Sequence, residues 1–120
     1  AGCFFIFLFK QIVKSIMQRL AFKMKLKEGK KNEYKKRHDA LWPELEGLLK
    51  AQGISEYSIF LDKDTHTLFA FQKVSGEGGS QELADNPIVK KWWDYMADIM
   101  EVNPNNSPVS IPLEEVFYLP

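Results

Sequence analysis

The amino-acid sequence predicts an α+β fold, in which helices cover one face of a four-stranded antiparallel sheet. Two short segments, residues 18–26 and 55–64, alternate apolar with polar side chains, which is the period of a half-buried strand. Two longer segments, residues 27–53 and 81–100, have the spacing and composition of helices. Residues 67–74 and 113–120 complete the pattern as two further strands.

The first strand and the first helical region follow directly from residue spacing. Over residues 18–26, the apolar side chains of Leu20, Phe22, Met24 and Leu26 alternate with the basic ones of Arg19, Lys23 and Lys25. Residues 27–53 then predict a helix that ends at Gly53 in a left-handed C-cap. Pro43 interrupts this helix, either as a kink or, in the favoured interpretation, as the first residue of a second helical piece.

The second half of the chain repeats this plan. "DKDTH", residues 62–66, is the turn between the second and third strands. The loop "SGEGGSQ" lacks the Lys-Ser/Thr pair of a phosphate-binding loop. Pro87 lies near the start of the longer helical piece, and a connection rich in proline and asparagine leads to the last strand. The order strand, helix, strand, strand, helix, strand is the βαββαβ order of ferredoxin-like folds.

This layout leaves one face of the sheet without helices. The apolar residues on that face need a cover, and a second copy of the chain can supply it. Phe117 and Tyr118, predicted in the last strand, suit such an interface. A homodimer is therefore the default expectation.

Composition limits the class of protein. A chain of 120 residues with 45% hydrophobic and 27% charged residues is one soluble globular domain. Its 16 basic and 16 acidic residues balance, so the net charge attracts neither nucleic acid nor an anionic membrane. Cys3 is the only cysteine, which excludes an intrachain disulfide and a cysteine-based metal site and fits a reducing, cytoplasmic setting.

The first residues differ from the rest. "AGCFFIFLF" is about half as long as the roughly twenty residues of a membrane span, and it lacks the flanks of a signal peptide. Phe9, Ile12, Val13 and Ile16 recur at helical spacing, so a membrane-surface helix is one alternative. We expect instead that residues 1–16 are a leader outside the domain, added or mis-started, with Met17 as the natural first residue.

Candidate chemical groups come from one helix and one strand. Tyr34, His38 and Leu41 have the i, i+4, i+7 spacing of an inward-facing stripe. His38 is either a core histidine held by a hydrogen bond or a proton donor, because imidazole titrates near neutral pH. Tyr34 packs in the core or shares a cavity with His38, and Tyr57 on the second strand can face the same cavity. His66 lies in a polar turn and is predicted to be exposed, so the two histidines form no metal site.

The tandem tryptophans Trp92 and Trp93 are the other distinctive feature. Adjacent helical residues point about 100° apart, so at least one of the two should reach a pocket, an interface or solvent. Indole faces stack on sugars and the indole N–H donates to hydroxyls, whereas core or dimer packing is the alternative. Asp94 and Asp98 nearby are predicted to be solvated. Without a recognisable Ser-His-Asp set, paired carboxylates or dinucleotide fingerprint, these residues favour proton transfer on a small, uncharged, sugar-like ligand.

Four motifs in order resemble the L-rhamnose mutarotase family: "EYKKRHDALWPEL", "YSIFLDKDTHTLFAF", "KKWWDYMADIM" and "NPNNSPV" followed by "EEVFYLP". The resemblance covers residues 17–120 as a single mutarotase-like domain, and residues 1–16 have no counterpart in the family. The segment "SGEGGSQEL" departs from the family's more acidic, tryptophan-containing stretch, and we expect this change to affect a surface helix rather than the chemistry.

The resemblance implies interconversion of the α and β anomers of L-rhamnose by a cytoplasmic homodimer, a dimeric α+β barrel without cofactor or metal. It implies that His38 is the proton donor with Tyr34 as its partner, and that Tyr34, Tyr57, Trp92 and Trp93 bind the substrate. Two alternatives remain. A haem-degrading or cofactor-free monooxygenase shares the dimeric layout and, in the haem case, would give a Soret band. A non-catalytic sugar-binding module would bind rhamnose without accelerating anomer exchange.

Overall fold

The computed structural model describes residues 17–76 and 78–120. The expected leader, residues 1–16, lies outside the described residues. The elements are β1 (Gln18–Lys25), α2 (Lys31–Asp39), α3 (Pro43–Ala51), β2 (Ile54–Asp62), β3 (Thr67–Val74), the 3-10 helix η1 (Ser80–Glu82), α4 (Pro87–Met96) and β4 (Ile111–Leu113). The strands form one antiparallel sheet in the order β2-β3-β1-β4. The predicted ferredoxin-like α+β fold is confirmed.

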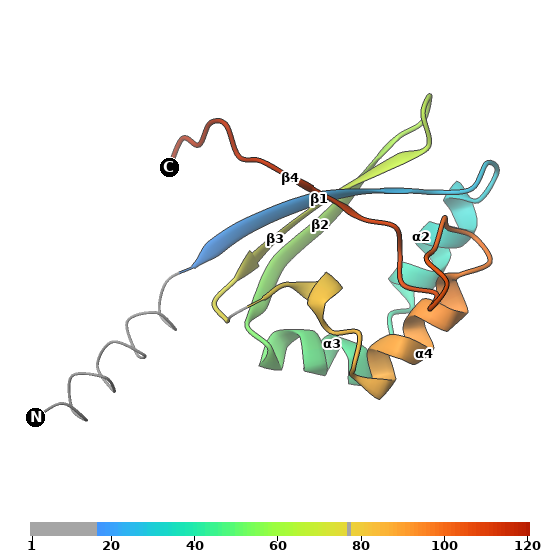
Figure 1. The fold of residues 1–120 in the computed structure, drawn as a ribbon, viewed down its shortest axis with the longest axis horizontal. Helices are drawn as coiled ribbons and strands as arrows, with labels where there is room; N and C mark the ends of the chain where they lie inside the picture. The colour runs from blue at the N-terminus through green and yellow to red at the C-terminus, as the bar shows by residue number, and fades with distance from the viewer. Residues whose placement is uncertain (1–16, 77) are drawn as a thin grey trace, which may run out of the picture.

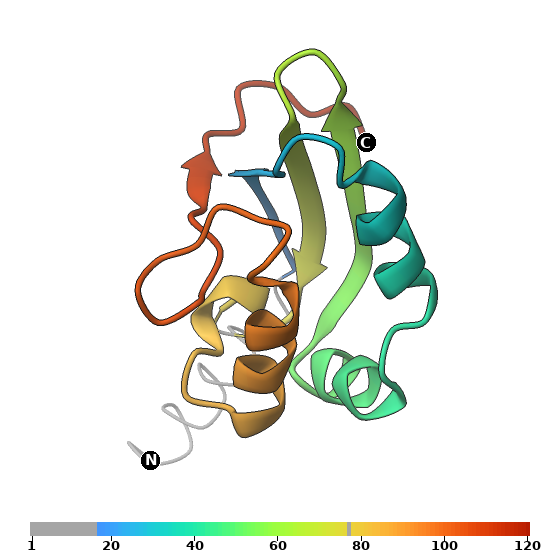
Figure 2. The same cartoon turned by 90° about the vertical axis from the view of Figure 1, so that its right-hand side faces the viewer.

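Helices α2, α3 and α4 all lie on one side of the sheet (Figures 1 and 2). The core lies between these helices and the inward side chains of β1 and β3. Phe22 pairs with Ala70 and Met24 with Leu68, and all four residues are buried. In β1, the apolar side chains of the predicted alternation therefore point into this core, and the basic side chains point to the opposite face of the sheet.

Proline and glycine set the helix boundaries. Pro43 is the first residue of α3, which confirms two helical pieces instead of one kinked helix. Gly53 follows the α3 C-cap with a φ of 84°, and an added Cβ would lie 2.4 Å from the Ser75 hydroxyl oxygen. Pro87 begins α4 in the same way, and the side chain of the N-cap residue Asn86 accepts a hydrogen bond from the Ile88 amide at 2.9 Å.

The predicted position of the last strand, residues 113–120, was wrong. The strand is β4, Ile111–Leu113, and residues 114–120 lie beyond it without strand pairing. Beyond the Ala21–Leu113 pair, side chains make the contacts with β1: Arg19 pairs with Glu115 and lies over the Tyr118 ring. Alternation in sequence cannot separate a strand from an extended segment that lacks a hydrogen-bonding neighbour.

The sheet face opposite the helices exposes several large apolar side chains, and no helix among residues 17–76 and 78–120 covers it. We define the open face by four exposed side chains on three strands, Phe60, Phe69, Ile111 and Leu113. Phe60 and Phe69 pair across β2 and β3. Phe117 and Tyr118, predicted to lie in the last strand, are exposed in the segment that follows β4.

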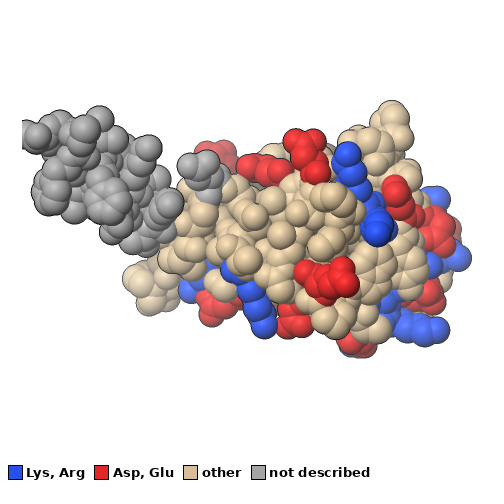
Figure 3. All heavy atoms as spheres, turned by 90° about the horizontal axis from the view of Figure 1, so that it is seen from below, with Lys and Arg blue, Asp and Glu red and all other residues tan. Residues whose placement is uncertain are grey.

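On the helix side, acidic and basic residues are interspersed around an uncharged centre (Figure 3). No helix within residues 17–76 and 78–120 has the length and apolarity needed to cross a membrane.

Candidate active site

A cavity of about 760 Å³ lies between the helices and the inward face of the sheet. This volume is in the range of small-molecule sites. Aliphatic side chains from α3, α4 and the sheet form much of its wall, and six charged residues also line it: Lys31, Lys35, Asp39, Glu46, Lys50 and Glu56. The polar and aromatic groups that reach it include all five residues predicted for the site: Tyr34, His38, Tyr57, Trp92 and Trp93.

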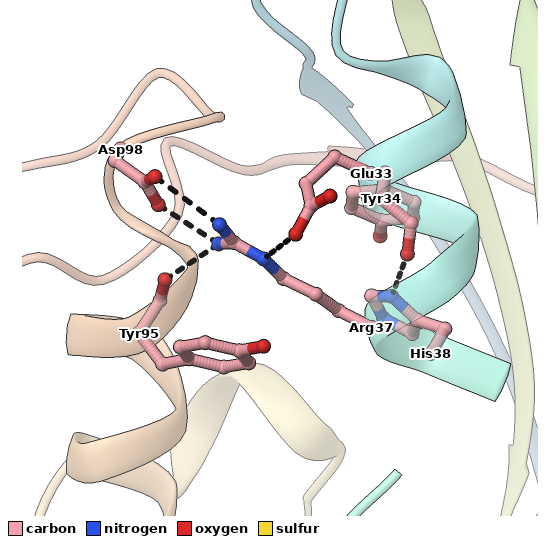
Figure 4. Close-up of polar contacts among 6 residues, drawn as sticks. All are labelled: Glu33, Tyr34, Arg37, His38, Tyr95 and Asp98. Carbon is pink, nitrogen blue, oxygen red and sulfur yellow. Dashed lines mark hydrogen bonds and ion pairs between the residues drawn. The ribbon is translucent and has the colours of Figure 1, made fainter. Parts of the chain in front are cut away.

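Helix α2 presents Tyr34 and His38 one turn apart. The two rings stack with centroids 4.2 Å apart, and the His38 ring meets the edge of Trp92 at 5.4 Å. His38 Nδ1 lies 3.0 Å from the Tyr34 carbonyl oxygen (Figure 4). Because a carbonyl only accepts, Nδ1 carries the hydrogen, and in the neutral ring Nε2 keeps a free lone pair.

Burial controls the protonation of both groups. It lowers the pKa of His38 below its ordinary 6.5, although the hydrogen bond to the Tyr34 carbonyl partly opposes the shift. It also raises the pKa of the Tyr34 phenol, and the neighbouring Tyr57 raises it further. Near pH 7, His38 is therefore a neutral base at Nε2, and Tyr34 is a protonated hydrogen-bond donor.

Tyr57 reaches the cavity from β2 beside two residues that the sequence analysis did not select. The Ser80 hydroxyl of η1 lies 3.4 Å from Tyr57 Oη, and the fully buried Gln72 of β3 holds Ser80. Burial raises the pKa of Tyr57, and the Ser80 contact lowers it. Gln72 could have been found, because its carboxamide stands between Ala70 and Val74 on the inward face of a predicted strand.

Both tryptophans are buried and both line the cavity. Trp92 packs edge-on against Trp42 at 5.1 Å and against Tyr95 at 5.7 Å, in addition to His38. The adjacent indoles thus both contribute to the wall of the same cavity.

Arg37, next to His38, joins α2 to the end of α4. We call this group of contacts the Arg37 cluster: the guanidinium donates to both carboxylate oxygens of Asp98 at 2.8 and 3.2 Å, to the Tyr95 carbonyl at 2.7 Å, and to Glu33 at 3.0 Å (Figure 4). It also lies 4.4 Å from the centre of the Tyr95 ring. Hydrogen bonding between them raises the pKa of Arg37 and lowers that of Asp98.

Three groups predicted to be solvated have more specific surroundings. Asp98 is exposed but paired, as above, and exposed Asp94 accepts a hydrogen bond from Asn106 at 3.0 Å. His66 is half-buried in its turn, with a φ of 58°. Within the described part of the chain, no three His, Cys, Asp or Glu side chains are grouped so that they could hold a metal ion.

The fold and the cavity define a small-molecule-binding α+β domain with acid–base groups at its site. The family model of L-rhamnose mutarotase matches residues 19–119. The L-rhamnose mutarotases of Formosa agariphila and Bacteroides thetaiotaomicron are 76% and 67% identical over 103 residues, which are 86% of this chain and 99% of each relative. The chain belongs to the L-rhamnose mutarotase family, and the resemblance seen in the sequence is confirmed.

One solved structure supports this assignment, and a second shares the fold. The crystal structure of L-rhamnose mutarotase from Formosa agariphila matches with a TM-score of 0.80 and 71% identity, over 86% of this chain and 99% of that one. A conserved protein from Methanosarcina mazei has a TM-score of 0.56 at 14% identity, over 88% of this chain and 98% of its own. The second match shows a shared fold only.

Proposed function

We propose that this chain is an L-rhamnose mutarotase, an isomerase that interconverts the α and β anomers of L-rhamnose, and that residues 17–120 carry the activity. Family membership supports the proposal. The single geometric observation that carries it is the His38 imidazole at the cavity wall, with Nδ1 bonded to the Tyr34 carbonyl and Nε2 left free. A neutral imidazole in this tautomer can take a proton from one sugar oxygen and pass it to another.

The reaction moves protons and breaks one C–O bond. The anomeric hydroxyl loses its proton, the bond between C1 and the ring oxygen breaks, and the ring oxygen gains a proton. Rotation about C1–C2 presents the other face of the new carbonyl, and reclosure reverses both transfers. No electrons enter or leave, so the chemistry calls for no redox cofactor.

His38 carries the proton from one sugar oxygen to the other. Its Nε2 first takes the proton from the anomeric hydroxyl, because the lowered pKa keeps the resting ring neutral. The imidazolium then donates this proton to the ring oxygen, which is bonded to the same carbon. In this way His38 acts as a proton donor although it starts without the extra proton. Positioned acid–base groups of this kind contribute about 10²–10⁴-fold.

Tyr34 is the partner of His38. Its raised pKa makes full loss of the phenol proton unfavourable, so Tyr34 serves as a hydrogen-bond donor to a sugar oxygen. Tyr57, Trp92 and Trp93 bind and orient the ring, since aromatic faces cover its C–H groups and the phenol and indole groups donate to its hydroxyls.

The direct test is NMR saturation transfer between the two anomeric proton signals of L-rhamnose, measured with and without protein. We expect exchange to be faster with the protein and proportional to its concentration. An exchange rate equal to that of buffer would contradict the proposal. Calorimetric binding of rhamnose at that buffer rate would instead indicate a binding module.

We also propose that the open face pairs with the same face of a second copy. Four large exposed apolar side chains on one sheet face favour a partner of similar character. In sedimentation velocity, we expect the 13.9 kDa chain to sediment as a dimer, and Phe69→Asp to sediment as a folded monomer. Asn105→Asp adds the same charge at an exposed loop position and should stay dimeric. A dimeric Phe69→Asp protein would place the interface elsewhere.

We propose a cytoplasmic location, which suits a chain whose only cysteine needs no oxidising compartment. The balanced charge provides no attraction for nucleic acid or an anionic membrane surface, so neither is proposed as a partner.

A further inference from the structure

A buried polar corner of the cavity is formed by Gln72, Ser80 and Tyr57. Gln72 is fully buried on the inward face of β3, among mainly apolar core residues. Its carboxamide bonds at both ends to Ser80 of η1, and Ser80 in turn contacts the Tyr57 phenol at the cavity. A buried carboxamide needs a hydrogen-bond partner for its nitrogen and another for its oxygen, so these two bonds fix the position of Ser80 in η1.

The hydrogen bonds in this corner have a defined direction. The Ser80 backbone N–H can only donate, and it donates to Gln72 Oε1 at 2.8 Å. The other end of the amide, Nε2, can also only donate, and it lies 2.9 Å from Ser80 Oγ. Gln81 Nε2 is a second donor to Oγ at 3.3 Å. Ser80 Oγ therefore accepts from the amides, and its own hydrogen remains for Tyr57 Oη at 3.4 Å.

This direction determines what Tyr57 can do. Since Tyr57 Oη accepts from Ser80, its own hydrogen points to another acceptor, and the cavity is where a ligand oxygen would lie. The Ser80–Tyr57 distance exceeds the usual O–H···O range of about 2.5–3.0 Å. The contact therefore orients the phenol hydrogen without holding the ring tightly.

We infer that Gln72 and Ser80 are positioning residues that make Tyr57 a hydrogen-bond donor to an oxygen of the bound sugar. This inference rests on the proposed function and deepens it, because it assigns a requirement for an acceptor oxygen on the sugar at this corner. Neither Gln72 nor Ser80 has to touch the sugar for the requirement to hold.

The test begins with Ser80→Ala, which leaves Tyr57 in place without its donor. We expect kcat/KM for anomer exchange, measured by saturation transfer, to fall about three- to tenfold, the worth of one hydrogen bond. Most of the change should be in KM, because the contact already forms with the bound substrate. The matched control is Ser75→Ala, five residues earlier in the chain. The Ser75 hydroxyl donates to the Gly53 carbonyl at 3.3 Å, and Ser75 does not line the cavity. It should leave kcat/KM unchanged.

A double-mutant cycle separates action through Tyr57 from a structural role. In a Tyr57→Phe background, Ser80→Ala should cause no further loss, since the phenol it orients is gone. An equal loss in both backgrounds would overturn the inference. If Ser80→Ala fails to fold, Ser80→Cys keeps the shape with a weak S–H donor, and the same cycle applies. Failure of the wild-type protein to accelerate exchange would refute the proposed function itself, whereas an active wild type with an inert Ser80 would refute this inference alone.

Discussion

Replacing His38 with alanine is expected to slow anomer exchange per folded site by about 10²–10⁴-fold. The substitution removes the only imidazole on the cavity wall, and the remaining phenols of Tyr34 and Tyr57 have raised pKa values that make them poor proton carriers. Saturation transfer measures the loss after subtraction of the buffer rate. Circular dichroism and thermal unfolding show whether the variant is folded.

His66→Ala is the matched control, because it removes the other histidine from a turn outside the cavity lining. It should keep wild-type exchange. A folded His38→Ala protein with near wild-type turnover would show that another group transfers the proton.

The pH dependence of catalysed anomer exchange should follow the titration of His38. His38 acts as a base in its neutral form, and burial places its pKa below 6.5. Catalysed exchange should therefore be at full rate at neutral pH and above, and should decline as the pH falls through the lowered pKa of His38. The free energy of unfolding should also fall on acidification, because charging the buried ring opposes folding. The contribution of the neutral ring to stability is fully present above the pKa of His38 in the unfolded chain. It is lost as the pH falls through the lower pKa of His38 in the folded protein. An increase in catalysed exchange on acidification would contradict the assigned starting state.

The local pattern of apolar, proline and glycine residues in the sequence predicted most of the helices and strands. Alternation identified β1 and β2, and Pro43, Gly53 and Pro87 marked the places where helices begin and end. The error at β4 arose because an extended segment becomes a strand only through a hydrogen-bonded neighbour, and the neighbour β1 lies about 90 residues earlier in the chain.

The sequence also predicted which residues lie together at the candidate site. Helical spacing placed Tyr34 and His38 on one face. The position of Tyr57 on a strand and the 100° spacing of the tandem tryptophans made these residues candidates too, before the family motifs supported all five. Spacing cannot reveal partners distant in sequence, so Ser80 appeared to be part of a flexible loop and Asp98 appeared to be a solvated carboxylate. These residues support the site residues from outside their own elements, and only the three-dimensional structure brings them together.

Arg37 is the strongest case of such support. Its side chain is 10% exposed and makes hydrogen bonds to two residues near the end of α4 and to Glu33 on its own helix. Loss of the guanidinium would release the contact between α2 and α4 beside His38. Since small displacements of a catalytic group cost large factors in rate, the effect should extend to the chemistry.

Arg37→Met keeps the length of the side chain and removes its charge. We expect the free energy of unfolding in urea to fall by about 1–3 kcal/mol. The loss is no larger because the Asp98 side chain is 66% exposed, so water can replace the hydrogen bonds from Arg37. Anomer exchange should fall at least about tenfold in protein that is still folded, as expected for a misplaced His38. Lys35→Met is the matched control for stability on the same helix: its ion pair with Asp39 is 72% and 64% exposed, so its loss should lower the free energy of unfolding by less than about 0.5 kcal/mol. Equal effects of the two substitutions would mean that the Arg37 cluster stabilises the site no more than a surface ion pair does. A stability loss with unchanged exchange would mean that α2 keeps its position without the cluster, and that the hydrogen bond to the Tyr34 carbonyl and the ring contacts with Tyr34 and Trp92 suffice to hold His38.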